Sequence, residues 1–462
     1  MKSVFLIVAA VLAAAVALMQ WTAAPPPDPA AVRLVWATDD NPLRQEQMAA
    51  FRAWYQQKYG VPIDIVIDPA NNDASKIIVQ SVVGAGPDLF DYSGPIGLRS
   101  FVESGVILDV TDAAHAENFG PDRFWPVLES SIAFRGRQYG VPDNVSCPLI
   151  LADADLLESK GLQPPAPGWT WRDLVSLGQA LSQDDAQGRR VRYGLIGIDW
   201  ADLILQNGGA FFNPSETRCV LNSPESVEAL QFYADLRNKY HIVPSGAELA
   251  SMAEQGGYGN EGNFNLFAGG RGAMISFGRY GYIMIRNLNA ERLAAGKRPL
   301  RVVPLPPLGE KRTVVTATGR CTGVNRKSQH RAEAVRFLEF LASREFNDLI
   351  NRRADSLNAM PEYDANGISG SGSAEPGCDD AVWTQAMANA VPQACSPFLN
   401  GAVQRRILLE EIDRLVNGVQ TPAEAAARME ARLNRAIAEY LKPRPDLRRE
   451  WERLDAVPSA TP

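Results

Sequence analysis

The chain has 462 residues, of which 46% are hydrophobic, enough to bury two substantial cores. Its formal net charge is -7, and its 46 Lys and Arg residues are scattered, so the concentrated basic surface with which proteins bind nucleic acid is not indicated. We therefore expect two lobes and no nucleic-acid partner.

The N-terminal segment predicts export. Val4–Met19 is an unbroken apolar run behind a single lysine, the layout of a secretory leader, and it is slightly short for a comfortable membrane span. Thr22-Ala23-Ala24 offers small residues for cleavage, but Pro25 follows them unfavourably. Residues 1–31 are therefore either a cleaved signal peptide or an anchor with a Pro-rich linker. We expect a periplasmic or other extracytoplasmic protein, which would touch the membrane only through residues 4–21 if they are uncleaved.

Strand and helix patterns alternate in the first part of the chain. Val32–Ala37 is a short apolar run typical of a buried strand, Ile63–Ile67 alternates as a second strand, and Asp88–Tyr92 predicts a third. Between the first two strands, apolar residues recur at helical spacing: Met48, Phe51, Trp54 and Tyr55. This alternation predicts an α/β lobe with a largely parallel sheet.

Helix signals position the later segments. Ser223-Pro224 places a capping hydroxyl before a proline at the first helical position, and Thr421–Glu424 is a capping box before an apolar stripe. We interpret Gly269–Gly278 as a Gly-rich helix start followed by a strand. The residues from Lys442 onward are expected to be solvated or loosely docked.

Several segments follow one another in the order of a known family. They are Gly86–Ser93 (GPDLFDYS), Tyr139–Leu162, Gly168–Leu174 (GWTWRDL), Asn207–Phe212 (NGGAFF), Asn222–Glu225 (NSPE), Phe267–Gly278 and Ala332–Leu341. In these motifs the chain resembles the bacterial extracellular solute-binding proteins of sugar-type ABC importers, the maltose-binding-like class. The resemblance spans roughly Val32 to Leu441.

The resemblance implies a two-lobed periplasmic-binding-protein fold, in which each lobe is a largely parallel sheet flanked by helices and the ligand cleft lies between the lobes. It places the first lobe at residues 32–143 and 305–350, the second at 144–304 and 351–441, and a C-terminal tail at 442–462. The implied function is to capture a sugar, oligosaccharide or polyol by lobe closure. The protein would act as a monomer, without a cofactor, and deliver the ligand to the transmembrane subunits of an ABC permease.

Candidate ligand contacts follow the strands of the first lobe. A sugar has apolar C–H faces and a rim of hydroxyls, so its site needs flat aromatic rings and many hydrogen-bonding groups. Asp39 and Asp40 follow the first predicted strand, and Tyr92 and Ser93 end the third. Ligands of open α/β sheets bind beyond the carboxyl ends of strands. Trp36 lies within an apolar run and is expected in the core.

Further candidates lie at the crossing between lobes and in the second lobe. Asp143 and Asn144 stand where the family's first crossing exposes polar groups, although a turn satisfied by its own backbone is the alternative. Asp199 and Trp200 end a strand-like run, and Asn207 opens a Gly-Gly turn. Trp200 is the best stacking candidate of the chain.

The resemblance adds three late positions and a fourth with two interpretations. It places a ring at the cleft at Tyr280, with Arg279 as a donor beside it, and Arg320 in a loop after a predicted strand. Asn358 stands where relatives usually have a proline. This change either adds an amide to the site or loosens a turn.

Five cysteines in an exported chain leave at least one unpaired. We favour a disulfide between Cys378 and Cys395, which would contribute roughly 3 kcal/mol by the chain-entropy estimate. The pairing of Cys147, Cys219 and Cys321 stays open.

Catalytic and metal sites find little support. The three histidines stand apart from one another, and Gly269–Gly272 lacks the lysine and hydroxyl residue of a nucleotide-binding loop. We therefore predict no metal site and no catalytic residue. A carbohydrate-active hydrolase is the alternative, because such an enzyme needs only two carboxylates beside a sugar cleft. A third possibility is an anchored protein that holds a partner and no solute.

Overall fold

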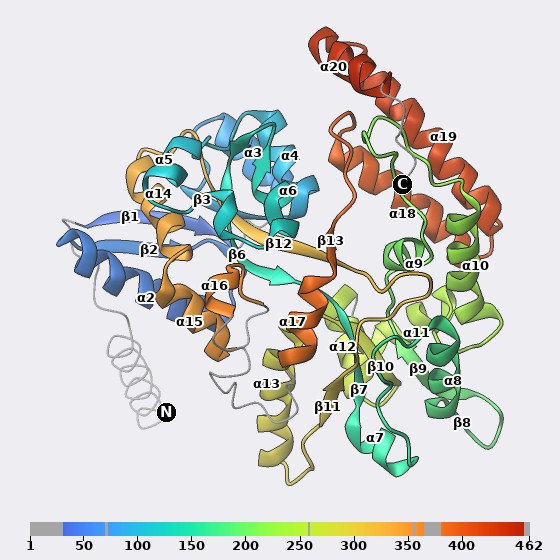
Figure 1. Cartoon of the computed structure of the whole chain (residues 1–462). Coiled ribbons are helices and arrows are strands. Elements are labelled where there is room, and N and C mark those ends of the chain that lie inside the picture. Colours follow the sequence, from blue (N-terminus) through green and yellow to red (C-terminus); the bar gives the residue numbers. More distant parts are fainter. Residues whose placement is uncertain (1–30, 70–72, 257–258, 354–356, 365–379, 457–462) are drawn as a thin grey trace, which may run out of the picture.

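A computed structural model describes residues 31–69, 73–256, 259–353, 357–364 and 380–456. These residues form two lobes, each built on its own β-sheet with helices around it (Figure 1). The two-lobed α/β fold expected from the sequence is confirmed.

The first lobe is built on a sheet in the order β13-β12-β3-β1-β2, with β6 paired to β12. Its strands are β1 (Val32–Ala37), β2 (Ile63–Ile67), β3 (Leu89–Ser93), β6 (Gly140–Ser146), β12 (Val315–Val324) and β13 (Ala390–Pro392). β2, β1 and β3 are parallel, whereas β12 runs antiparallel to both β3 and β6. The predicted first and second strands are observed with the same bounds.

Helices and a small hairpin complete the first lobe. They are α2 (Pro42–Tyr59), α3 (Ala74–Val82), α4 (Gly94–Ser104), α5 (Thr111–Ala116), η2 (Pro121–Arg123), η3 (Pro126–Leu128), α6 (Glu129–Ile132), β4 (Ala133–Phe134), β5 (Arg137–Gln138), α14 (Arg331–Leu341), α15 (Arg344–Arg353), α16 (Pro361–Asp364) and α17 (Asp380–Ala388). The Phe51 ring of α2 meets Phe337 of α14 with centroids 4.9 Å apart, and Trp36 meets the same ring at 5.0 Å. Trp36 is fully buried, as predicted.

The second lobe is built on a sheet in the order β11-β7-β10-β9-β8. Its strands are β7 (Leu149–Asp153), β8 (Gln183–Asp184), β9 (Arg190–Ile196), β10 (Gly272–Phe277) and β11 (Val302–Pro304). Its helices are α7 (Ala154–Ser159), α8 (Trp171–Leu181), α9 (Trp200–Gln206), α10 (Pro224–Asn238), α11 (Gly246–Gly256), α12 (Gly259–Ala268), α13 (Gly281–Ala294), α18 (Gly401–Val416), α19 (Pro422–Leu441) and α20 (Pro445–Asp455). β9 and β10 are parallel. β7 runs antiparallel to both β10 and β11, and β8 runs antiparallel to β9.

The predicted helix caps are confirmed, and one predicted helix start is wrong. The Ser223 side chain accepts a hydrogen bond from a backbone N–H of α10, and Thr421 forms a capping box with Glu424 at the start of α19. By contrast, the glycines before β10 follow the end of α12 and do not begin a helix. Gly270 has a φ of 76°, a left-handed conformation that glycine adopts easily and that ends helices.

The segment after Lys442 is docked as a helix. In α20 the Leu447 side chain is buried, and Trp451 Nε1 donates to the Thr217 carbonyl oxygen at 2.8 Å. Asp455 accepts a 2.7 Å hydrogen bond from the Thr217 hydroxyl. Residues 445–455 therefore pack against the second lobe. The sequence allowed either a solvated or a loosely docked segment, and the observed helix is docked.

Three segments connect the lobes. The chain passes from β6 to β7 at residues 147–148, from β11 to β12 at residues 305–314, and from β13 to α18 at residues 393–400. β13 pairs with β12 of the first sheet, although it lies within the range 351–441 predicted for the second lobe. We therefore propose that the third crossing lies at 393–400; the rest of the predicted lobe division stays a proposal.

The apolar interior forms two clusters whose boundary runs through the second sheet. One cluster joins the first-lobe core to the side chains beneath the second sheet, through buried Cys147 and Leu149 at the first crossing. The other lies between that sheet and the helices α8, α9, α10, α18 and α19. The first crossing is thus packed into a core.

Within the described ranges, no helix combines the length and apolar character needed to cross a membrane. Residues 4–21, which the sequence identifies as a leader or anchor, lie outside those ranges.

Candidate functional site

Two adjoining cavities lie where the lobes face each other. The outer cavity has a volume of about 810 Å³, and its walls come from α3, β3 and α4 of the first lobe and from α18 of the second. The inner cavity has a volume of about 190 Å³ and lies between α4, α9 and α18. Both are lined by Ile96, Gln393, Arg405 and Leu409, so they form one cleft with two compartments.

On the first lobe, Arg320 joins three predicted or neighbouring carboxylates. Its guanidinium donates to Asp143 at 2.6 Å and to Asp39 at 2.7 Å, and its Nε lies 3.7 Å from Asp91. Asp143 is completely buried, whereas half of Asp39 is exposed. Arg44 Nε donates to the same Asp39 oxygen at 3.1 Å. The structure thus brings together the predicted residues Asp39, Asp143 and Arg320, but their charges are paired with one another.

Asp91 lines the outer cavity and is held by three donors. It accepts hydrogen bonds from Trp36 Nε1 at 2.8 Å, from the Thr38 hydroxyl at 2.6 Å and from the Thr322 hydroxyl at 2.8 Å. Burial raises the pKa of Asp91 to about 6, and the nearby Arg44 charge and the hydrogen bonds offset part of this effect. Both of its oxygens are therefore engaged within the protein.

Tyr92 and Ser93 line the outer cavity in different ways. The Tyr92 side chain is 6% exposed. Its ring centroid lies 6.1 Å from that of Phe101, which also lines the outer cavity. Ser93 is exposed at the start of α4, where its side chain makes no capping hydrogen bond. The Ser93 hydroxyl is therefore open to a ligand, while Tyr92 is mainly a core residue.

On the second lobe, Asp199 and Trp200 line the inner cavity beside Phe211. The Trp200 and Phe211 ring centroids are 5.6 Å apart, with the planes tilted by 48°. Trp200 is half-buried, and Asp199 is exposed at the N-terminus of α9, where one of its oxygens accepts from the Ala201 N–H at 2.8 Å. An aromatic ring beside an accessible carboxylate is the arrangement that the sequence predicts at these two residues.

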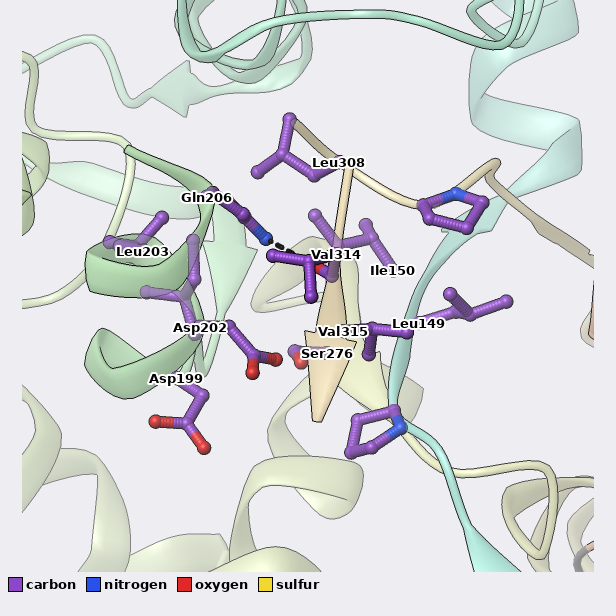
Figure 2. A pocket seen from close by; sticks show the side chains of 13 residues that line it. Leu149, Ile150, Asp199, Asp202, Leu203, Gln206, Ser276, Leu308, Val314 and Val315 are labelled. Carbon is purple, nitrogen blue, oxygen red and sulfur yellow. Dashed lines mark hydrogen bonds between the residues drawn. The ribbon is translucent and has the colours of Figure 1, made fainter. Parts of the chain in front are cut away.

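The same helix holds the second crossing segment. Figure 2 shows a small cavity of about 30 Å³ between α9 and the first residues of β12, with Asp199 and Asp202 on its helical side. Asp202 accepts a 3.0 Å hydrogen bond from the Thr316 N–H. Gln206 Nε2 donates to the Val314 carbonyl at 3.3 Å, the bond that is dashed in Figure 2. Burial, followed by the Asp199 charge, raises the pKa of Asp202 to about 7. α9 thus runs from the inner cavity to the hinge.

Two predicted residues have structural contacts away from both cavities. Asn207 is buried, and its Nδ2 donates to the Glu225 carbonyl and to Glu228, both at 2.8 Å. Asn358 is also buried and accepts from the Met360 N–H at 2.8 Å within a turn. The side chain at Asn358 fits the turn interpretation, and a ligand role for either residue stays a prediction.

Seven other predicted residues line neither cavity: Asp39, Asp143 and Arg320, whose contacts are given above, and four more. Asp40 is exposed, Asn144 is 8% exposed on β6, and Arg279 is buried. The Tyr280 ring is half-buried and packs on Phe277 with centroids 4.8 Å apart. Their contact with a ligand stays a prediction.

Sequence reasoning missed several groups that line the cleft. Phe211 belongs to the NGGAFF motif and could have been found there, because an adjacent aromatic pair in a loop is a stacking signal. Gln404 and Arg405 lie on α18, and Gln393 precedes it. Their pattern is that of an ordinary amphipathic helix, so no sequence signal separates them from surface residues.

The cysteines and possible metal ligands add no further site. Cys147, Cys219 and Cys321 are buried thiols, and Cys395 Sγ lies 3.0 Å from Arg99 Nη1. Cys378 lies outside the described residues, so its predicted pairing with Cys395 stays a prediction. No group of three or more His, Cys, Asp or Glu side chains in the described part of the chain could hold a metal ion.

Comparison with solved structures confirms the fold. A substrate-binding protein of an ABC transporter from Listeria monocytogenes, in complex with cycloalternan, has a TM-score of 0.73 at 20% identity, covering 88% of this chain and 99% of that one. A solute-binding protein from Thermotoga lettingae, bound with α-D-tagatose, has a TM-score of 0.70 at 20% identity, covering 88% and 100%. A maltose-bound protein from T. maritima has a TM-score of 0.69 at 20% identity, covering 87% and 99%.

A family model matches most of the chain. The model of the bacterial extracellular solute-binding proteins matches residues 38–347, a range that contains every strand of both sheets except β1 and β13. The motifs identified in the sequence lie within or beside this range, and the two-lobed fold agrees with it. The chain belongs to the family of bacterial extracellular solute-binding proteins.

Proposed function

We propose that this solute-binding protein captures a saccharide or polyol outside the cytoplasm and delivers it to an ABC permease. The observation that carries the proposal is the cleft between the lobes, which combines the Trp200–Phe211 ring pair with open polar groups. Rings stack on the C–H faces of sugars, and the polar groups bind hydroxyls. The solved structures of similar fold hold cycloalternan, tagatose and maltose, which supports the same ligand class.

The mechanism is lobe closure about the three crossing segments. Leu409 lines both cavities and is 52% exposed, an apolar surface that a ligand or the opposite lobe would cover. Ligand contacts made in the closed form shift the population toward that form. α9 couples the two events, because Trp200 lies in the inner cavity and Asp202 holds the Thr316 N–H of β12.

Delivery requires the closed form to dock on the transmembrane subunits, and a monomer is sufficient for this. Family membership supports a location outside the cytoplasm. We propose that residues 4–21 direct export and serve as an anchor if they are not removed.

A ligand screen tests the proposal. Thermal shift and calorimetry with mono- and oligosaccharides should give saturable stabilisation by at least one saccharide. Small-angle scattering with that saccharide should show a smaller radius of gyration than without it. Absence of stabilisation by every saccharide or polyol, or binding without compaction, would contradict the proposal.

The hydrolase alternative is not favoured. A glycosidase needs an accessible acid and a second carboxylate. Asp199 is accessible, but both Asp91 oxygens accept hydrogen bonds from protein donors and Arg320 holds Asp143 and Asp39, so none of these three first-lobe carboxylates is free to act as the second group. Incubation of the purified protein with the saccharide that it binds should therefore yield no cleavage product. Detection of cleavage by chromatography would favour the hydrolase alternative.

A further inference from the structure

The inner cavity has the size of a single sugar ring. Its volume is about 190 Å³, compared with about 810 Å³ for the outer cavity. A cavity of about 150 Å³ accommodates benzene, so the inner cavity has room for one six-membered ring with its hydroxyls and not for two. The outer cavity has room for several.

The walls of the inner cavity are mostly apolar. Leu205 of α9 and Leu408 of α18 line it together with the Trp200–Phe211 pair, in which the ring centroids are 5.6 Å apart. Such walls match the C–H faces of a pyranose. A ring held there must find its hydrogen bonds among few polar groups.

Gln404 is the best placed of these groups. It lines the inner cavity, it is 1% exposed, and its Nε2 donates to the Ala394 carbonyl at 2.7 Å. Its Oε1 is buried and has no hydrogen-bond partner among the described residues. A buried acceptor without a partner is unfavourable, and a ligand hydroxyl that donates to it removes this cost.

Asp199 offers a second acceptor at the same cavity. One of its oxygens accepts from the Ala201 N–H, and the side chain is accessible to solvent. Gln404 and Asp199 come from α18 and α9, so two different helices would fix the orientation of one ring.

We propose that the inner cavity binds the terminal ring of an oligosaccharide and that Gln404 Oε1 accepts a hydroxyl of this ring. The following sugar units lie in the outer cavity, which shares Ile96, Gln393 and Arg405 with the inner one. The inference rests on the proposed function and narrows its ligand class to saccharides of at least two units.

Calorimetry of the full chain with glucose, maltose, maltotriose, cellobiose and cellotriose tests this inference. The di- or trisaccharide of one series should bind at least tenfold more tightly than glucose. The variant Gln404→Met, similar in shape but without the acceptor, should lose at least tenfold in affinity for that ligand. Gln420→Met is the matched control, because Gln420 is also buried with an unpaired Oε1 but lines neither cavity. Its affinity should stay within twofold of the unmodified protein.

A second variant covers the case in which Gln404→Met does not fold. Ala201→Phe fills the inner cavity from α9 and should reduce the affinity for the longer saccharide to that for glucose or below. Wild-type affinity in both folded variants, or glucose binding as tightly as the trisaccharide, would overturn the inference and leave the proposed function standing. No binding of any saccharide to the unmodified protein would overturn both.

Discussion

The two walls of the cleft treat their polar groups in opposite ways. On the first lobe, Asp91 of the outer cavity accepts three internal hydrogen bonds, and its neighbour Arg320, which lines neither cavity, binds Asp39 and Asp143. On the second lobe, Asp199 is accessible and the Gln404 acceptor is unpaired among the described residues. Both walls are rich in polar residues, but the carboxylates of the first are paired, whereas the second has an accessible carboxylate and a buried acceptor without a partner among the described residues.

This difference assigns stability to one wall and ligand recognition to the other. A polar group already paired within the protein has little to offer a ligand, because the ligand must replace existing bonds. An unpaired group gains a bond when the ligand enters. We therefore expect the first wall to govern stability and its pH dependence, and the second to govern affinity.

The largest expected effect concerns the first wall. Arg320→Met removes the cation that binds the fully buried Asp143, and it should cost about 3–5 kcal/mol of unfolding free energy. Urea unfolding measures this loss. Arg218→Met breaks an exposed pair with Asp455 and should cost about 1 kcal/mol or less. Equal losses in the two variants would show that the Arg320 network does not stabilise the first lobe.

The pH dependence of stability should come from the same wall. The pKa of Asp91 is raised to about 6 from the ordinary value of 3.8, so between these pH values the folded state holds a proton that the unfolded state releases. Stability linked to Asp91 therefore falls as the pH rises through this window, by on the order of 2–3 kcal/mol.

Thermal unfolding of the wild type and of Asp91→Asn at pH 4, 5, 6 and 7 measures this effect. The stability of the wild type relative to the variant should decrease from pH 4 to 6 and then level off. A constant difference across the series would exclude Asp91 as the source.

The second wall should control affinity. Trp200→Ala removes the half-buried ring of the inner cavity and should weaken saccharide binding about 30-fold, the effect of losing a contact of about 2 kcal/mol. Trp451→Ala is the control. Trp451 of α20 donates a hydrogen bond to the Thr217 carbonyl and lines neither cavity. It should lower the melting temperature and leave the affinity unchanged. Affinity loss in both variants would point to general destabilisation.

The smallest effect is expected at Arg405. This exposed side chain lines both cavities and forms no ion pair with the described residues, so Arg405→Gln should weaken binding of a neutral saccharide by less than about fivefold. Arg414→Gln is the control, since Arg414 is exposed on the same helix and lines neither cavity, and it should leave the affinity unchanged. A much larger loss at Arg405 with an acidic saccharide in the same calorimetry would change the ligand class to anionic sugars.

Much of the fold could be predicted from local pattern. The apolar runs of β1 and β2 and the caps of α10 and α19 depend on residues a few positions apart, so the sequence shows them directly. The glycines before β10 were misread, because Gly-Gly marks a helix end as readily as a start. The pairing of β13 with β12 could not be predicted, because the two strands lie far apart in the sequence.

Less of the candidate site could be predicted. Asp199 and Trp200 were found because they end a strand pattern, and the structure places both in the inner cavity. Tyr92 fits the same pattern but points into the core, since alternate residues of β3 face opposite sides of the sheet. Gln404 had no signal, because its spacing on α18 is that of any helix.

The sequence by itself determined the family, the two lobes and the positions of most strands and helices, because short-range periodicity, capping and motif order specify them. Only the tertiary structure decided which polar groups are paired. Arg320 and Asp143 are 177 positions apart, and Gln404 lines one cavity with α9 residues about 200 positions earlier in the chain. Hydrogen bonding and burial are properties of neighbours in space, and those neighbours come from distant parts of the chain.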